Sequence, residues 1–231
     1  PYTTLFRSGE DFTATAAEFG ADFGTITAGE NVNIESTGAD LALRDITATN
    51  GNVTATAKNG SVSVADSVTA GDTLEVTAKE DIAIDGAVAA QNVDATAESG
   101  SITVSGNMAT GGNIALRAKE NITAENLSTE TGGSVKAVSI EGNVTIADVS
   151  AKDNIEITAA KGNATLANAS STAGGLSVSA GENAIVDGKS AAANIIIAAG
   201  KNATLRGDGT ASEDVRLSAG NNVIAMDVAA G

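Results

Sequence analysis

The sequence predicts an all-β fold, a single-stranded parallel β-helix (β-solenoid), and three observations lead to this prediction. First, one unit of about 20 residues recurs along the chain, and a fixed period in this range is typical of a solenoid. Second, apolar and polar residues alternate with a period of two within each unit, which indicates strands with one buried face. Third, corners rich in Gly, Asn and Asp fall every ten residues or so, which leaves no room for a helix of even three turns and disfavours a helical solenoid.

The repeat is clearest in Asn52–Val64, and the rest of the chain is this unit with small changes. The first apolar residues of the units are Phe12, Val32, Val53, Leu74, Val93, Ile114, Val135, Ile155, Leu176, Ile195 and Val215. The steps between them are 19 to 21 residues, so we expect about eleven coils of about 20 residues in one quasi-one-dimensional domain.

Each unit divides into three segments, here illustrated by one coil. Val53–Ala57 alternates apolar and Thr residues, Val62–Val64 is a strand of three residues, and Val68–Ala70 is a weaker segment that ends in a small residue. Three short strands and three corners make one turn of a triangular coil, in which each strand hydrogen-bonds to its counterparts one turn before and after. We expect the winding to be right-handed, because left-handed β-helices usually show a hexapeptide pattern that is absent here. At about 4.8 Å per coil the rod would be on the order of 50 Å long.

Composition excludes several classes of function. The 231 residues contain no Cys and no His, so disulfides, thiolate metal sites and the usual general base are all missing. A formal charge of −16 opposes binding to nucleic acid and to anionic membranes. Since no apolar run approaches the roughly 20 residues that span a bilayer, we expect no membrane insertion.

The two ends differ from the middle. Pro1–Ser8 has no match in the repeat and resembles the in-frame translation of a common sequencing adapter, so we assign the β-helix to residues 9–231. Phe12, Phe19 and Phe23 are expected to fill a wider first layer or to stack on a preceding coil. Because the repeat is still running at Gly231, we expect a fragment of a longer chain.

Asn, Asp or Ser stands before nearly every strand. Those assigned to the first strand of a unit are Asn52, Asp72, Asn92, Asn113, Ser134, Asn154, Asn194 and Asp214, and those assigned to the second are Asn31, Asp40, Ser61, Asp81, Ser101, Asn121, Asn143, Asn163, Asn183, Asn202 and Asn222. Asn tolerates a sharp corner, and stacked amides can hydrogen-bond along the rod, so the interpretation is structural. The alternative is glycosylation, because five of these residues begin sequons: Asn52, Asn121, Asn143, Asn163 and Asn202.

Thr and Ser recur at one level of the outer faces. They are Thr56, Thr77, Thr96, Thr158, Ser179 and Ser218 on the first face and Ser63, Thr103, Thr123, Thr145, Thr165 and Thr204 on the second. A regular Thr array can bind ice or a glycan lattice, although Thr is also the default residue of a solvated strand. Breaks at Ala83, Arg117, Ile185 and Ala198 weaken the lattice interpretation.

One tripeptide is a candidate cell-attachment site. Arg206-Gly207-Asp208 is the sequence that integrins recognise, and its place at a corner favours exposure. The structural alternative is that Gly207 is only a turn residue, in the same corner as Asp85-Gly86 and Asp187-Gly188. We expect no catalytic, cofactor-binding or metal-binding residue: the Gly-Gly-x-Gly-x-Asp calcium pattern does not occur, and no long loop carries a repeated carboxylate pair.

The repeat style resembles a known family of shafts. Units such as Gly51-Asn-Val-Thr-Ala-Thr-Ala57, repeated at about 20 residues over Gly9–Gly231, resemble the shaft of filamentous haemagglutinin-like bacterial adhesins, which leave the cell by two-partner secretion or as autotransporters. The resemblance implies a structural shaft on a secreted or cell-surface protein that holds binding domains away from the bacterium. Its partners would be host-cell surface or matrix components, or other bacterial cells. The alternative is that the repeat faces or the Arg206-Gly207-Asp208 corner bind a receptor, matrix protein or glycan directly.

Overall fold

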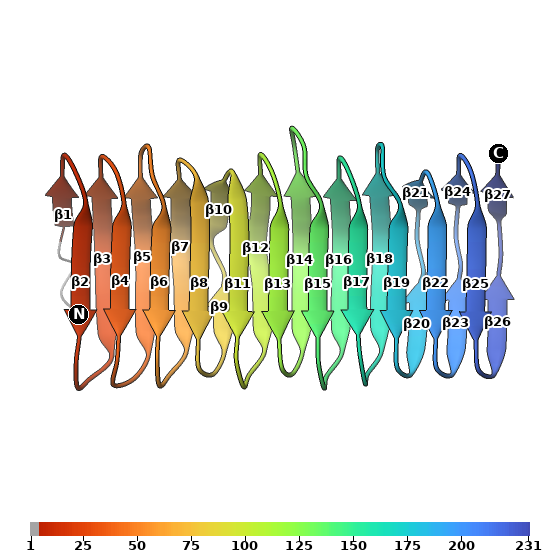
Figure 1. Cartoon of the computed structure of the whole chain (residues 1–231), viewed down its shortest axis with the longest axis horizontal. Coiled ribbons are helices and arrows are strands. Elements are labelled where there is room, and N and C mark those ends of the chain that lie inside the picture. Colours follow the sequence, from red (N-terminus) through yellow and green to blue (C-terminus); the bar gives the residue numbers. More distant parts are fainter. Residues whose placement is uncertain (1–4) are drawn as a thin grey trace.

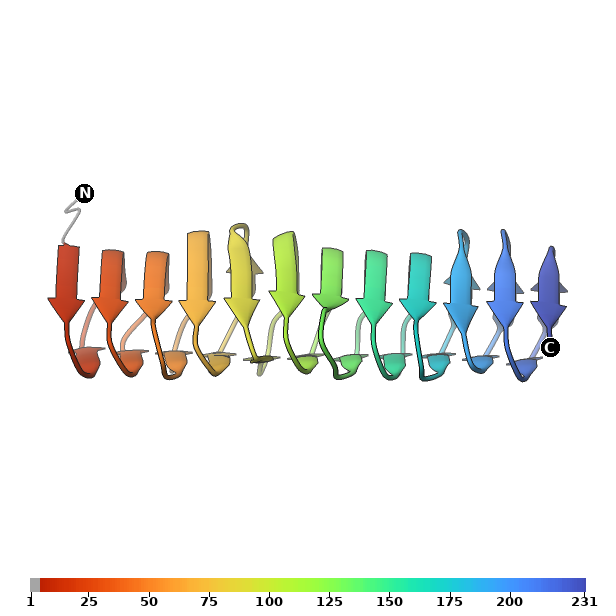
Figure 2. The ribbon, with the colours of Figure 1, turned by 90° about the horizontal axis from the view of Figure 1, so that it is seen from above.

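The computed structural model describes residues 5–231, which form a straight rod of stacked β coils. In this part of the chain every element is a strand and every strand pairing is parallel. Figures 1 and 2 show the coils advancing along one axis, with the first coil at one end and the last at the other. The predicted β-solenoid is therefore confirmed.

One face of the rod is a sheet of eleven strands, one from each coil. These strands are β2 (Phe12–Ala16), β4 (Val32–Ser36), β6 (Val53–Ala57), β8 (Thr73–Ala78), β11 (Asn92–Ala97), β13 (Ile114–Ala118), β15 (Val135–Ser139), β17 (Ile155–Ala159), β19 (Leu176–Ala180), β22 (Ile195–Ala199) and β25 (Val215–Ala219). All eleven predicted first apolar residues, from Phe12 to Val215, pair with one another in unbroken register. The predicted number of coils and the start of each are confirmed.

The other two faces belong to one sheet of sixteen strands. Most coils cross both faces in a single strand: β3 (Ala21–Ala28), β5 (Leu41–Ala48), β7 (Val62–Ala70), β12 (Ile102–Thr110), β14 (Ile122–Thr129), β16 (Val144–Ala151) and β18 (Ala164–Ser171). Four coils use two strands instead: β9 (Ile82–Ile84) with β10 (Ala87–Ala90), β20 (Asn183–Val186) with β21 (Ser190–Ala192), β23 (Asn202–Leu205) with β24 (Gly209–Ala211), and β26 (Asn222–Ala225) with β27 (Val228–Ala230). In each coil, the part of this sheet that comes first in the chain lies on what we call the second face, and the part that follows lies on the third face.

The corner between the second and third faces differs from the sequence-based expectation. In most coils it is a bend inside one strand, because only one or two residues separate the two inward-facing segments. Between β5 and β7 the register slips at this bend: Arg44 alone occupies it in β5, whereas Ala65 and Asp66 occupy it in β7. The extra residue is a β-bulge, which turns the strand without breaking the sheet.

The winding of the coil is right-handed. In Figure 1 the near strands, such as β4, run downward and the far strands, such as β5, run upward, while the coils advance from left to right. An observer who looks along the rod from the first coil towards the last therefore sees the chain turn clockwise as it moves away, which is a right-handed coil. This agrees with the handedness expected from the missing hexapeptide pattern.

The core is a column of small layers, each closed by the next coil. Inward side chains such as Val76 and Ile157 are fully buried, while their neighbours Glu75 and Glu156 are exposed. The alternation read from the sequence therefore assigns the two sides of these strands correctly. Aligned Val, Ile, Leu and Ala side chains fill the interior over almost its whole length.

The first coil holds a cluster of aromatic rings. The ring of Phe6 lies 5.1 Å from that of Phe12 and 6.4 Å from that of Phe23, between centroids. Phe12 and Phe23 thus pack on each other and on Phe6 of the preceding strand, which agrees with the expected stacking on a preceding coil. The expectation is wrong for Phe19, which lies on a corner with 78% of its surface exposed. Phe6 belongs to β1 (Leu5–Ser8), which pairs in register with β3.

The pairing of β1 bears on the amino-terminal segment set aside from the repeat. Leu5–Ser8 continues the stack of the third face, so this half of the segment is part of the coil in space. Residues 1–4 lie outside the described residues. The adapter origin of Pro1–Ser8 stays a prediction.

Candidate functional site

A ladder of polar side chains runs along the corner before the second face. The Oδ1 atom of Asn143 accepts hydrogen bonds from the backbone N–H of Asn163 at 2.8 Å and from its Nδ2 at 3.0 Å. At each step one or both of these hydrogen bonds link successive coils, through Asp40, Ser61, Asp81, Ser101, Asn121, Asn143, Asn163, Asn183, Asn202 and Asn222. The expected stacking of the corner amides is confirmed. The left-handed backbone, the other reason for Asn at a sharp corner, is not found, because among residues 5–231 the only non-glycine residue with a positive φ is Asp227.

A second ladder runs along the corner before the first face. Asn52 donates its backbone N–H to Oδ1 of Asn31 at 2.9 Å, and Asn31 donates to Oδ1 of Asp11 at 3.0 Å. Asn31 thus belongs to this ladder, and its assignment to the second-strand set was wrong, because it directly precedes β4 of the first face. The two hydrogen bonds from Asn31 lower the pKa of Asp11 below its usual value, the backbone bond contributing most.

The ladders bear on the sequons. In four of the five, the side-chain amide nitrogen already donates to the coil before: Asn52, Asn143, Asn163 and Asn202. A glycan would attach to that same nitrogen. A glycosylated amide nitrogen keeps one N–H, so the bond between coils would survive only where the glycan replaces the hydrogen that does not bridge the coils.

Ion pairs add a third kind of link between coils. The Nζ atom of Lys136 lies 2.9 Å from the carboxylate of Glu156, its register partner in the next strand, and that of Lys161 lies 3.1 Å from the carboxylate of Glu141. The hydrogen bond and charge of Lys161, with a contribution from Lys119, lower the pKa of Glu141. All these pairs are exposed, so water and salt screen them and each contributes little to stability.

The Arg206-Gly207-Asp208 corner joins β23 to β24 and is exposed at both charged residues. Gly207 has a φ of +86°, and a Cβ there would approach the carbonyl oxygen of Gly188 to 2.8 Å, so glycine is required by the turn. Nε of Arg206 donates to Oδ1 of Asp187 at 2.7 Å. The corner thus stacks on Asp187-Gly188 as the sequence suggested, and its guanidinium is already paired.

The outward Thr residues form short regular rows. On the first face Thr56, Thr77 and Thr96 are register partners on three consecutive coils, up to the break at Arg117. On the second face Thr103, Thr123, Thr145 and Thr165 are register partners on four consecutive coils. The row ends at Ala83 on one side and at Ile185 on the other.

Beyond this row the second face becomes partly apolar. Thr204, expected to be exposed, is only 8% exposed, because it pairs on either side with the larger Ile185 and Ile224.

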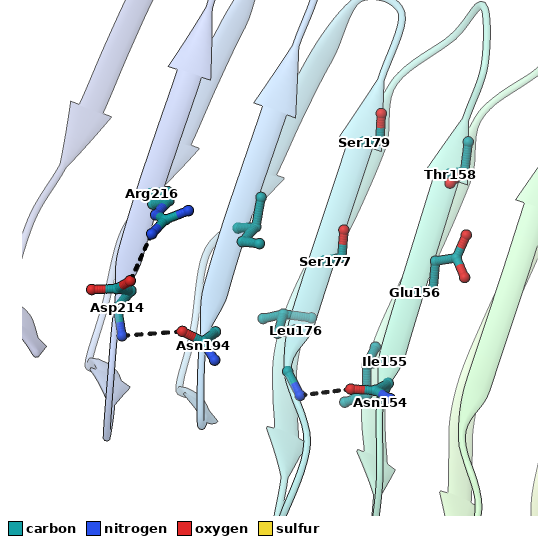
Figure 3. Close-up of a pocket in the computed structure, with 12 residues that line it drawn as sticks. Asn154, Ile155, Glu156, Thr158, Leu176, Ser177, Ser179, Asn194, Asp214 and Arg216 are labelled. Atoms are coloured by element: carbon teal, nitrogen blue, oxygen red, sulfur yellow. Dashed lines mark hydrogen bonds and ion pairs between the residues drawn. The ribbon is translucent and has the colours of Figure 1, made fainter.

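A shallow groove of about 730 Å³ lies on the outer surface of the first face, over β17, β19, β22 and β25 (Figure 3). Its floor is the small outward side chains of β19, Ser177 and Ser179. Glu156 and Thr158 of β17 border it on one side, and Ile196 of β22 and Arg216 of β25 on the other. Of these, Thr158 and Ser179 belong to the Thr and Ser rows identified in the sequence.

The groove could have been found from the sequence by aligning the coils. Ser177 takes the outward position that Glu156 holds in the coil before and Ile196 in the coil after. Because Ser177 is smaller than Glu156 and Ile196 on either side, the surface is hollowed over β19.

Neither a metal-binding cluster among the described residues nor a match to a known protein points to a function. Over residues 5–231, no three acidic side chains gather in a way that could hold a metal ion. The same residues include no helix of the length and apolar character that a membrane crossing needs. No protein-family model, no curated protein and no solved structure matches the chain.

Proposed function

We propose that this chain is a structural shaft: a stiff rod that holds binding domains of a secreted or cell-surface bacterial adhesin away from the cell. The observation that carries the proposal is the unbroken register of the first face over eleven coils, with no long loop in the described part of the chain. Backbone hydrogen bonds, two polar ladders and ion pairs all run between coils, along the axis that a shaft must keep rigid. The adhesin context comes from the resemblance of the repeat.

A deletion series tests the shaft function. The full chain is displayed on bacteria between a membrane anchor and a reporter domain, and the height of the reporter above the membrane is measured by fluorescence. Removing residues 114–154 joins Asn113 to Ile155, the register equivalent of Ile114 two coils later, and should lower the reporter by about 10 Å while the rod stays folded.

The matched control removes residues 114–144, which ends the deletion out of phase with the coil. This variant should lose thermal stability and collapse the spacing. A reporter height that does not follow the number of coils would contradict a rigid shaft.

Adhesion separates the shaft from direct binding. Surfaces coated with the full chain are offered to host cells and matrix proteins, beside an Asp208→Glu variant. Absence of adhesion agrees with a spacer. Saturable adhesion that the variant loses would instead assign binding to the Arg206-Gly207-Asp208 corner, in spite of the pairing of Arg206 with Asp187.

A further inference from the structure

We propose that the groove on the outer surface of the first face binds a neutral linear oligosaccharide. This goes beyond the shaft function and does not rest on it. The groove follows β19 between β17 and β22, which lie about 10 Å apart because each is one strand spacing from β19. This width and the volume of about 730 Å³ suit a single unbranched chain of sugars.

The polar groups of the groove suit a ligand rich in hydroxyls. The hydroxyls of Thr158, Ser177 and Ser179 form no hydrogen bond with any described residue, so all three can donate to and accept from a ligand. At the end of the groove, Oδ1 of Asn154 accepts the N–H of Gly175 at 2.9 Å, which turns the amide and leaves its NH₂ group toward solvent (Figure 3). Ile196, 42% exposed, offers an apolar surface for the C–H face of a sugar ring.

The charged side chains of the groove favour a neutral ligand. Each charged side chain that lines the groove has an opposite partner: Glu156 pairs with Lys136, and Arg216 pairs with Asp214 at 2.8 Å. The lining itself holds Glu156, Asp214 and Arg216, a net charge of −1 that Lys136 offsets from outside the groove, while the whole protein carries −16 and repels anionic polymers. An acidic glycan has nothing here to compensate for that repulsion.

A peptide is a poorer occupant than a sugar. Extended peptides usually bind by adding a strand to an open sheet edge, but β17, β19 and β22 are each paired on both sides. The groove also lacks the deep apolar pocket that anchors side chains, since Ile196 is its one exposed large apolar residue. With no aromatic ring to stack on a sugar, we expect a dissociation constant on the order of 1 mM.

The test is an amide NMR titration of the folded full chain with four probes: cellohexaose, mannohexaose, chitohexaose and, as the anionic comparison, a hyaluronan hexasaccharide. At least one neutral probe should give saturable shifts at Ser177, Ser179 and Ile196. Ser177→Leu fills the floor and should weaken binding at least tenfold. Ala115→Leu is the matched control, because Ala115 holds the same register position three coils earlier, outside the groove.

Ser179→Leu repeats the test at the second floor position in case Ser177→Leu lowers the melting temperature. Three outcomes overturn the proposal: no saturable shift with any neutral probe, equal binding by Ser177→Leu and Ala115→Leu, or tighter binding of the hyaluronan fragment.

Discussion

Asn163 is held twice by Asn143, once through its backbone N–H and once through its side-chain amide, and both bonds end on one oxygen atom. Asn143 is held in the same way by Asn121 of the coil before. Each side chain thus accepts a hydrogen bond from a corner N–H that the sheet leaves free. The residue that donates this bond does the same for the coil after it. At this corner, the side-chain hydrogen bonds between two neighbouring coils therefore depend on a single residue.

Replacing Asn143 with Ala should therefore destabilise the rod. The change removes the acceptor of the corner N–H of Asn163 and the bond to Asn121, and since both bonds are exposed each should cost about 0.5 to 1.5 kcal/mol. For a chain of this size the melting temperature should fall by about 2 to 4 °C for each kcal/mol. Asn143→Ser is the matched control, because Ser101 already accepts the N–H of Asn121 at one rung of the ladder. Equal melting of the two variants would show that the acceptor is unimportant.

The two sides of a first-face strand should respond differently to charge. Val76→Asp buries a carboxylate without a partner and should cost more than about 4 kcal/mol. Glu75→Lys, one residue earlier and exposed, lies beside Asp94 in the next strand and should change stability by less than about 0.5 kcal/mol. Thermal melting followed by circular dichroism measures both, and similar losses would refute the assigned facing.

Replacing Ser190 with Ala should not destabilise the protein. Its hydroxyl is buried and has no hydrogen-bond partner among the described residues, so Ser190→Ala should leave stability unchanged or raise it by about 1 kcal/mol. Ser171 is the comparison, because its hydroxyl donates to the carbonyl of Asp153 and accepts the N–H of Gly174. Ser171→Ala should cost about 1 to 3 kcal/mol in the same denaturation experiment. A loss on Ser190→Ala would mean that its hydroxyl has a partner in solution.

Acid should weaken the link between Lys161 and Glu141. The pKa of Glu141 is lower in the folded protein than its ordinary value of 4.5, so its contribution to stability is present above pH 4.5 and is lost as the pH falls through the folded pKa. The melting temperature of the wild-type chain should therefore approach that of Glu141→Gln below this pH. A difference between the two that stays constant from pH 7 to pH 3 would contradict the assignment.

The fold could be predicted almost completely from the sequence, because eleven repeats show the same pattern of apolar residues and corners. Period-two alternation identified the buried side, as at Val76, and the residue before each strand identified the corners, as at Asn143. The bend at Ala65-Asp66 could not be predicted, because the same small and polar residues serve both a loop and a bulge. Nor could the placement of Phe6 inside and Phe19 outside, which depends on how the first layer is closed.

The candidate sites were less predictable than the fold. The exposure of Arg206-Gly207-Asp208 followed from its corner, but its pairing with Asp187 depends on the coil beneath. The groove was missed, because its depth is a difference between side chains on neighbouring coils and is invisible within one unit. Ser177 is unremarkable in its own strand and becomes a floor only between Glu156 and Ile196.

The parallel pairing of each coil with the next also governs how quickly the chain can fold. Every strand pairs with one about 20 residues away in a chain of 231, so the relative contact order set by these pairings is about 0.09. Values this small belong to helical bundles, whereas most all-β proteins must close far longer loops before their strands meet. Residues 5–231 contain no helix, yet their strands meet by closing loops of only about 20 residues, so that one coil can template the next.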